Sequence, residues 1–238
     1  LGLVILAVFV LFLVVKMPQS KEGSAMPSLG DTFKKLGENT TYVLGVVAQI
    51  LYVGAQIMTW TYIYQYAEAI DLANVNVEGY EKIDVFFYQF LAFVLFTVGR
   101  IIGTAMLRFM SSGKLLMLFA LLAGFFVIGA IFIEGIYGLY SIVGISFCMS
   151  LMFPTIYGIA LNDLSEEQSK VGSAGLVMAI VGGALLPMFQ GMIIDLGGNG
   201  VSDTEVWGVS EVNFSFILPL ICFVYIAWYG NKVNLKAN

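Results

Sequence analysis

The chain contains 238 residues, of which 59% are hydrophobic and only 11% are charged, and its net charge is −5. Soluble domains typically carry about 25% charged residues, so this composition excludes an ordinary water-soluble domain. The sequence has no basic tract and no histidine, so we expect no nucleic-acid partner, no metal site and no cofactor.

Long apolar stretches alternate with short polar connections from one end of the sequence to the other. Residues 115–133, for example, contain no charge and no proline. At 1.5 Å per residue, a helix of this length spans roughly 30 Å, the thickness of the hydrocarbon core of a bilayer. The pattern predicts an all-α, polytopic membrane helix bundle. The expected spans are residues 1–15, 42–66, 85–107, 115–133, 137–161, 172–194 and 212–229.

The first apolar stretch, residues 1–15, has no preceding basic residues and no small-residue cleavage site, so it does not fit a signal peptide. We expect it to be the end of a truncated transmembrane helix. Residues 16–41 form the longest and most polar connection, which we interpret as a linker. Six spans follow as one transmembrane unit over residues 42–230, and residues 231–238 form a short tail.

Basic residues are distributed unevenly between the two sides of the membrane. If the linker marks one side, that side holds nine Lys and Arg residues, whereas the opposite side holds only Lys82. By the positive-inside rule, the linker and the carboxyl-terminal tail are expected to be cytoplasmic. The acidic residues of the opposite side are expected to lie in solvated loops. They are Glu68, Asp71, Glu78, Glu81, Asp84, Asp203, Glu205 and Glu211.

The order of linker and spans implies that the whole protein has a second set of membrane helices. A linker followed by six spans that end in the cytoplasm implies that the part before the linker also held about six helices. A six-plus-six bundle joined by a long cytoplasmic loop resembles the major facilitator superfamily, whose halves are repeats. The expected partners are therefore the lipid bilayer and a missing amino-terminal half.

The span 42–66 carries polar groups on one helical face. Gln49, Tyr52, Gln56 and Trp60 follow each other at helical spacing. Because an uncompensated amide in hydrocarbon costs several kcal/mol, roughly 2–7, this face is not expected to contact lipid. One interpretation is hydrogen bonding between packed helices. The other, which we favour, is a water-filled cavity that binds a neutral polyhydroxylated solute.

The span 85–107 contains Arg100, the one ionisable group placed well inside a span. It lies about 12 Å from Arg108 along a straight helix. A charge within the membrane favours a functional role, so we expect Arg100 to act in a gate or to bond neighbouring helices, with snorkelling to the interface as the alternative. Gly99 and Gly103 flank it and allow close approach of another helix.

Small residues and prolines mark two later spans. Gly175 and Gly183 belong to a small-xxx-small pattern that predicts tight helix packing. Pro187 in the same span and Pro154 in the preceding one predict kinks. As an alternative to tight packing, the span that contains Pro187 is a kinked helix that moves. No catalytic motif is present, so we do not expect an enzyme.

Several segments resemble the L-fucose permease family of sugar:proton symporters. The resemblance covers residues 41–230, in order and with compatible spacing. The matching segments are 48–56 with Trp60 for the seventh helix, 99–109 for the eighth, 149–156 for the tenth and 178–195 for the eleventh. Asn162 and Asp163, at the cytoplasmic end of the tenth helix, depart from the family pattern.

The resemblance implies alternating access between two six-helix halves and uptake of a monosaccharide with a proton, in a bacterial inner membrane. In the family, the proton-linked carboxylates belong to the amino-terminal half. Gln49, Tyr52, Gln56 and Trp60 would line the sugar site, and Arg100 would serve the cytoplasmic gate, with Asn162 or Asp163 as its nearest partners. The alternatives are a helical membrane subunit and a transporter of another small polar solute.

Overall fold

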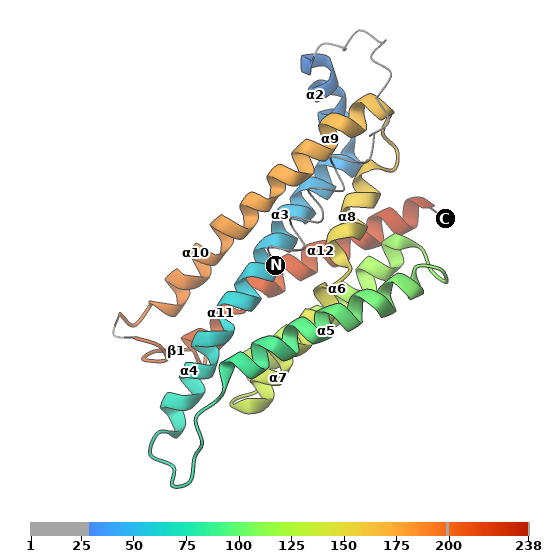
Figure 1. Ribbon diagram of the computed structural model, residues 1–238. Coiled ribbons are helices and arrows are strands. Elements are labelled where there is room, and N and C mark those ends of the chain that lie inside the picture. Colours follow the sequence, from blue (N-terminus) through green and yellow to red (C-terminus); the bar gives the residue numbers. More distant parts are fainter. Residues whose placement is uncertain (1–28, 199, 238) are drawn as a thin grey trace, which may run out of the picture.

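The structure, a computed structural model, describes residues 29–198 and 200–237 (Figure 1). The expected helix end at residues 1–15 and residues 16–28 of the linker lie outside the described residues. Within the described part of the chain, six helical segments are long and apolar enough to cross a membrane. The predicted all-α membrane bundle is therefore confirmed. These segments are Thr40–Asn74, Val85–Met106, Ser112–Phe132, Ile136–Leu161, Glu166–Ile194 and Glu211–Leu235.

Most spans consist of more than one helix. A short helix, α2 (Leu29–Glu38), precedes the first of them. The spans contain α3 (Thr40–Thr61), α4 (Ile63–Asn74), α5 (Val85–Met106), α6 (Ser112–Phe132), α7 (Ile136–Met149), α8 (Met152–Leu161), α9 (Glu166–Met178), η1 (Ala179–Val181), α10 (Gly182–Ile194), α11 (Glu211–Ser215) and α12 (Ile217–Ala237). A small antiparallel hairpin, β1 (Glu205–Val206) and β2 (Val209–Ser210), lies between α10 and α11.

Polar caps set several helix starts. The side chains of Asn39, Asp84, Ser111, Ser165 and Ser210 each accept a hydrogen bond from a backbone N–H of the following helix. At Ser165 the cap is reciprocal, because the Gln168 side chain accepts from the Ser165 N–H. This capping box explains why the fifth span begins at Glu166 and not at residue 172, where the apolar pattern begins.

Helix α3 lies at the centre of the bundle and packs against α8, α10 and α12, whereas α6 packs against α12 and α7, and α5 runs along α7. The tight contact between α3 and α10 depends on glycine: a Cβ at Gly182 would clash with the backbone carbonyl of Ile50. The largest buried side chains lie in this core and include Tyr52, Tyr66 and Phe223. The spans formed by α5 and by α9–α10 are the least buried.

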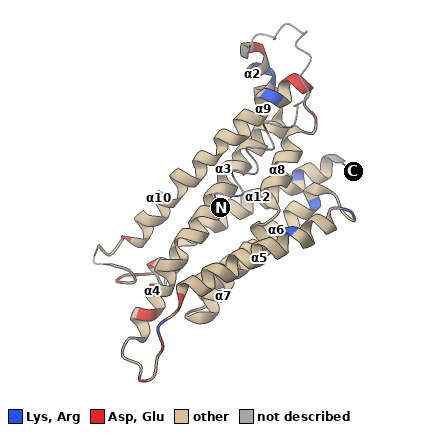
Figure 2. Cartoon of the chain, viewed as in Figure 1, with Lys and Arg blue, Asp and Glu red and all other residues tan. Residues whose placement is uncertain are grey.

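The charged residues gather at the two ends of the bundle (Figure 2). Lys and Arg residues lie on α2, α9 and the ends of α5, α6 and α12 nearest the carboxyl terminus, whereas acidic residues lie at both ends, on α2 and α9 and again on α4 and its connection to α5. The middle of the bundle is almost free of charge.

Candidate functional site

The span 136–161 is interrupted in its middle. Helix α7 ends at Met149 and α8 begins at Met152. Pro154 follows the break, and because proline has no N–H it leaves the backbone carbonyl of Ser150 without its helical donor. The interruption therefore exposes backbone acceptors inside the membrane, where each needs another donor.

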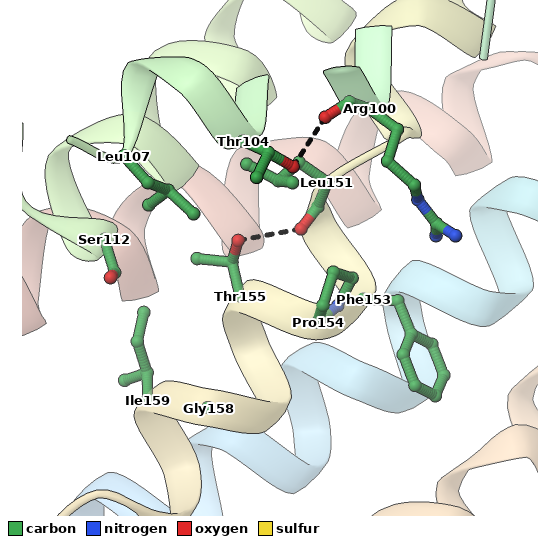
Figure 3. A pocket seen from close by; sticks show the side chains of 10 residues that line it. All are labelled: Arg100, Thr104, Leu107, Ser112, Leu151, Phe153, Pro154, Thr155, Gly158 and Ile159. Atoms are coloured by element: carbon green, nitrogen blue, oxygen red, sulfur yellow. Dashed lines mark hydrogen bonds between the residues drawn. The ribbon is translucent and has the colours of Figure 1, made fainter. Parts of the chain in front are cut away.

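Side chains from two other spans supply those donors, and a side chain of α8 adds a further bond next to them. The Tyr52 hydroxyl on α3 donates to the Met149 carbonyl at 3.0 Å. The Arg100 Nε on α5 donates to the Ser150 carbonyl at 3.2 Å. The Thr155 hydroxyl on α8 donates to the Leu151 carbonyl at 2.7 Å, as Figure 3 shows. The Met149 and Ser150 carbonyls are thus held by side chains of other spans, whereas the Leu151 carbonyl also keeps its helical donor, the Thr155 N–H, at 3.2 Å.

Two glycines bring α5 against the break. A Cβ at Gly99 would lie 2.7 Å from the Ser150 Oγ and would also clash with the Phe147 carbonyl. One turn further, a Cβ at Gly103 would lie 3.1 Å from a Leu151 methyl group. Only glycine allows this approach, and the approach brings the Arg100 guanidinium within reach of the Ser150 carbonyl.

Trp60 lies on the other side of the break, next to α5 and α7. Its indole Nε1 donates to the Ser146 Oγ at 3.1 Å. Its ring packs edge-on against Phe93 and Phe96, with centroids 5.1 and 5.3 Å away. The Arg100 guanidinium carbon lies 5.2 Å from the centroid of the same Phe96 ring. Phe96 therefore links the indole to the guanidinium.

The four polar residues of α3 do not share one environment. Gln49 and Tyr52 are fully buried, whereas Gln56 and Trp60 are only partly buried. Neither amide atom of Gln49 has a hydrogen-bond partner within the described residues. In this conformation, a solute in contact with the bundle surface could reach Gln56 and Trp60 but not Gln49 or Tyr52.

A cavity of about 600 Å³ opens next to the break (Figure 3). Its lining includes one cation and three hydroxyl groups but no carboxylate. The residues are Arg100, Thr104, Leu107, Ser112, Leu151, Phe153, Pro154, Thr155, Gly158 and Ile159. The Thr104 hydroxyl donates to the Arg100 carbonyl, so its proton is already used. The guanidinium is therefore the main polar donor that this cavity offers.

Asn162 and Asp163 lie in a neighbouring cavity of about 540 Å³. The Asn162 Nδ2 donates to the Asp163 Oδ1 at 3.0 Å. The two cavities share Ser112, Gly158 and Ile159. Among the described residues, Arg100 bonds the Ser150 carbonyl, whereas Asn162 bonds Asp163, so the expected bond from Arg100 to either of these residues is not formed in this conformation.

The fifth span also bends, at a place other than its proline. The short 3₁₀ segment η1 separates α9 from α10, whereas Pro187 lies inside α10. The Tyr62 hydroxyl donates to the Pro187 carbonyl at 2.7 Å. Gly175 faces the Tyr42 hydroxyl, and a Cβ at Gly183 would lie 3.0 Å from side chains of α3. Both glycines therefore lie at contacts with α3.

The end of the bundle opposite the carboxyl terminus contains buried polar residues that the sequence analysis did not predict. Glu211, expected in a solvated loop, is fully buried, and its Oε1 accepts from the Asp203 N–H at 3.1 Å. One turn along α11, the Ser215 Oγ accepts from Gln190 at 2.9 Å. Asn213 donates to the Tyr66 hydroxyl at 3.2 Å. The spacing of Ser210 and Asn213, which form a helix cap, was the signal available in the sequence.

The chain is similar throughout its length to sugar transporters. No model of a known protein family matches it. The L-fucose-proton symporter of Haemophilus influenzae is 48% identical over 97% of the chain and 50% of that relative. A glucose/galactose transporter of Brucella abortus is 31% identical over 97% of the chain and 51% of that relative. The chain thus spans about half the length of the curated relatives it matches.

Solved structures agree with this assignment. The crystal structure of the fucose:proton symporter FucP of Escherichia coli superposes with a TM-score of 0.80 at 25% identity, over 96% of this chain and 52% of that one. A second structure of FucP, described as a major facilitator superfamily transporter in the outward conformation, gives a TM-score of 0.79. With its six spans, this chain is an integral membrane protein. Over nearly its whole length the chain is similar to about half of the L-fucose-proton symporters and of FucP, a transporter of the major facilitator superfamily.

Proposed function

We propose that the chain is the carboxyl-terminal half of a proton-coupled sugar transporter that works by alternating access. The observation that carries this proposal is the 48% identity to the L-fucose-proton symporter of Haemophilus influenzae, maintained over 97% of the chain. The proposed substrate is an L-fucose-like monosaccharide. Glucose and galactose are the second candidates, because relatives at about 31% identity carry those names.

The sugar site is proposed to lie along α3. Gln56 and Trp60, which are partly exposed, offer an amide and an indole ring to a sugar, whose hydroxyls need hydrogen bonds and whose C–H face packs on aromatic rings. Tyr52 supports this site from behind by its bond to the Met149 carbonyl. Gln49, buried without a partner in this conformation, would complete the site if α3 and its neighbours separate during transport.

Arg100 is proposed to serve the cytoplasmic gate. Its guanidinium stays protonated at physiological pH, so Arg100 cannot carry the transported proton. The proton carrier is accordingly proposed to lie in the missing amino-terminal half. Arg100 would instead hold the helix break in one of two conformations, because its bond to the Ser150 carbonyl joins two separate spans. Asn162 and Asp163 would contribute at the neighbouring cavity.

The proposed orientation of the chain in the membrane follows from the distribution of its Lys and Arg residues. Residues 16–41 would form a cytoplasmic linker, residues 42–230 the transmembrane half, and residues 231–238 a cytoplasmic tail, in a bacterial inner membrane. A helical membrane subunit and a transporter of another small polar solute are the competing functions. The first would use the polar face of α3 for packing alone, and the full burial of Gln49 and Tyr52 is the observation in its favour.

The test is uptake by the full-length protein that contains this chain, reconstituted into vesicles. With the outside more acidic than the lumen, labelled L-fucose should accumulate, and a protonophore should abolish the accumulation. An excess of unlabelled glucose or galactose measures which sugar is preferred. Uptake of a polar solute that is not a sugar would support the competing transporter, and no uptake of any solute would contradict transport.

A further inference from the structure

The hairpin between α10 and α11 holds a tryptophan in an unusual backbone conformation. Trp207 and Gly208 join β1 to β2, and both have positive φ, 55° and 79°. Two successive positive φ angles are typical of a type I′ turn, in which Asn or Gly usually occupies the first position. A bulky L-residue there is strained, so some contact outside the turn is needed to explain it.

The turn presents the indole ring outwards on a well-anchored support. The Trp207 side chain is 87% exposed, and its contact with the bundle is edge-on packing against Phe214, 5.5 Å between centroids. The base of the hairpin is held in place because the Glu211 N–H donates to the Thr204 carbonyl and the Asp203 N–H donates to Glu211. The ring is therefore fixed in position while most of its surface has no protein contact.

A second tryptophan lies further along the same span, seven residues before its end at Leu235. Trp228 on α12 is 47% exposed, and the Lys232 Nζ lies 5.1 Å from its ring centroid. Glu211 to Trp228 covers about 26 Å of helix, and the hairpin extends this towards roughly 30 Å, the thickness of the hydrocarbon core. Figure 1 shows the hairpin at the end of the bundle opposite the carboxyl terminus. The two rings are therefore separated along the helix by about the thickness of the hydrocarbon core.

A bilayer interface matches Trp207 better than a solute does. Tryptophan is enriched at both membrane–water boundaries, where its amphipathic ring lies among the lipid headgroups. Solute sites are concave, and Trp207 lines neither of the two cavities described above.

We propose that the β1–β2 hairpin places the Trp207 ring at the headgroup–acyl boundary of the leaflet opposite Trp228 and Lys232. The lipid contact accounts for the strained turn, and the two tryptophans together fix the height of α11–α12 in the membrane. This proposal is independent of the transported solute.

Fluorescence quenching of the full-length protein in phospholipid vesicles tests it. The emission of Trp207 is obtained as the difference between the wild type and Trp207→Asn, a variant whose side chain suits the turn and relieves its strain. Phospholipid brominated near the headgroup should quench this difference signal by severalfold more than phospholipid brominated near the chain end, and aqueous iodide should have little effect. Trp207→Phe gives the same subtraction if the Asn variant does not fold, and Trp228→Phe provides the matched signal from the other leaflet.

Three results would overturn the proposal. Strong quenching by iodide without quenching by brominated lipid would place the ring in water. A change on adding L-fucose or galactose, with no response to brominated lipid, would make Trp207 a solute contact. Protection from both quenchers would mean that the ring is covered by protein.

Discussion

The Arg100 Nε donates its hydrogen bond to the carbonyl of Ser150, the acceptor that Pro154 leaves without a helical partner. A proline in one span is thus compensated by a cation from another span. The bond couples the position of α5 to the geometry of the α7–α8 break. Any movement that separates α5 from α7 must expose this carbonyl or find it another donor.

Arg100→Lys should lower transport without preventing folding. Lysine keeps the charge but loses the planar group whose Nε reaches the carbonyl, and a hydrogen bond from a charged group contributes about 1.5–3 kcal/mol. Uptake and the labelling of cysteines introduced on the cytoplasmic side should both change in the full-length protein. Arg108→Lys, at an exposed position after the end of α5, is the matched control. Unchanged uptake and labelling in Arg100→Lys would reduce Arg100 to an interfacial anchor.

Pro154→Ala should stabilise the protein while slowing transport. Alanine restores an N–H that can bond the Ser150 carbonyl, which makes a continuous helix more favourable and displaces Arg100. Thermal unfolding in detergent and sugar uptake measure the two effects. Pro219→Ala is the control, because Pro219 lies in the first turn of α12, where no helical bond is lost. An uptake rate equal to that of the wild type would show that the break is not required for the transport cycle.

Gln56→Leu should weaken sugar uptake while membrane abundance stays unchanged. The substitution removes an amide from the partly exposed face of α3 and leaves a sugar hydroxyl unpaired, an effect of about 1–3 kcal/mol. Concentration-dependent uptake should show a higher KM, by roughly tenfold, since about 1.4 kcal/mol corresponds to tenfold in affinity. If the kinetics remain those of the wild type, the sugar does not contact this face.

Tyr52→Phe should destabilise the bundle, because it leaves the buried Met149 carbonyl without its donor, at a cost of about 1–3 kcal/mol. Tyr64→Phe is the matched control, since Tyr64 is exposed on α4 and makes a ring contact with Phe86 that phenylalanine would preserve. The midpoint of thermal unfolding in detergent should fall for Tyr52→Phe and stay nearly constant for Tyr64→Phe. Equal midpoints would indicate that Met149 finds another donor.

Gly99→Ala should disrupt the contact of α5 with the break. The added methyl group would clash with the Phe147 carbonyl and the Ser150 Oγ, which are held in the packed interior. Gly158→Ala is the control, because nothing lies within 4 Å of its Cβ position and alanine favours a helix by roughly 0.5–1 kcal/mol. Thermal stability should fall for the first variant and hold or rise for the second. The opposite order would place α5 differently against α7.

The helical architecture could be predicted because span length and the absence of charge are local properties of the sequence. The environment of Gln49 could not, since its burial depends on how the neighbouring helices pack around α3. The burial of Glu211 depends in the same way on the fold of the preceding hairpin and the Asp203 N–H. Pro154 does predict a free carbonyl at Ser150, but the choice of Arg100 as donor depends on packing at Gly99.

The interruption at residues 150–151 divides one span between two packing partners. Helix α7 lies mainly against α5 and α6, whereas α8 lies mainly against α3. The two pieces therefore answer to different neighbouring helices. A tilt of α3 would carry α8 with it while α7 stays in place, so the cavity at Pro154 and Gly158 could change shape on one side of the membrane alone.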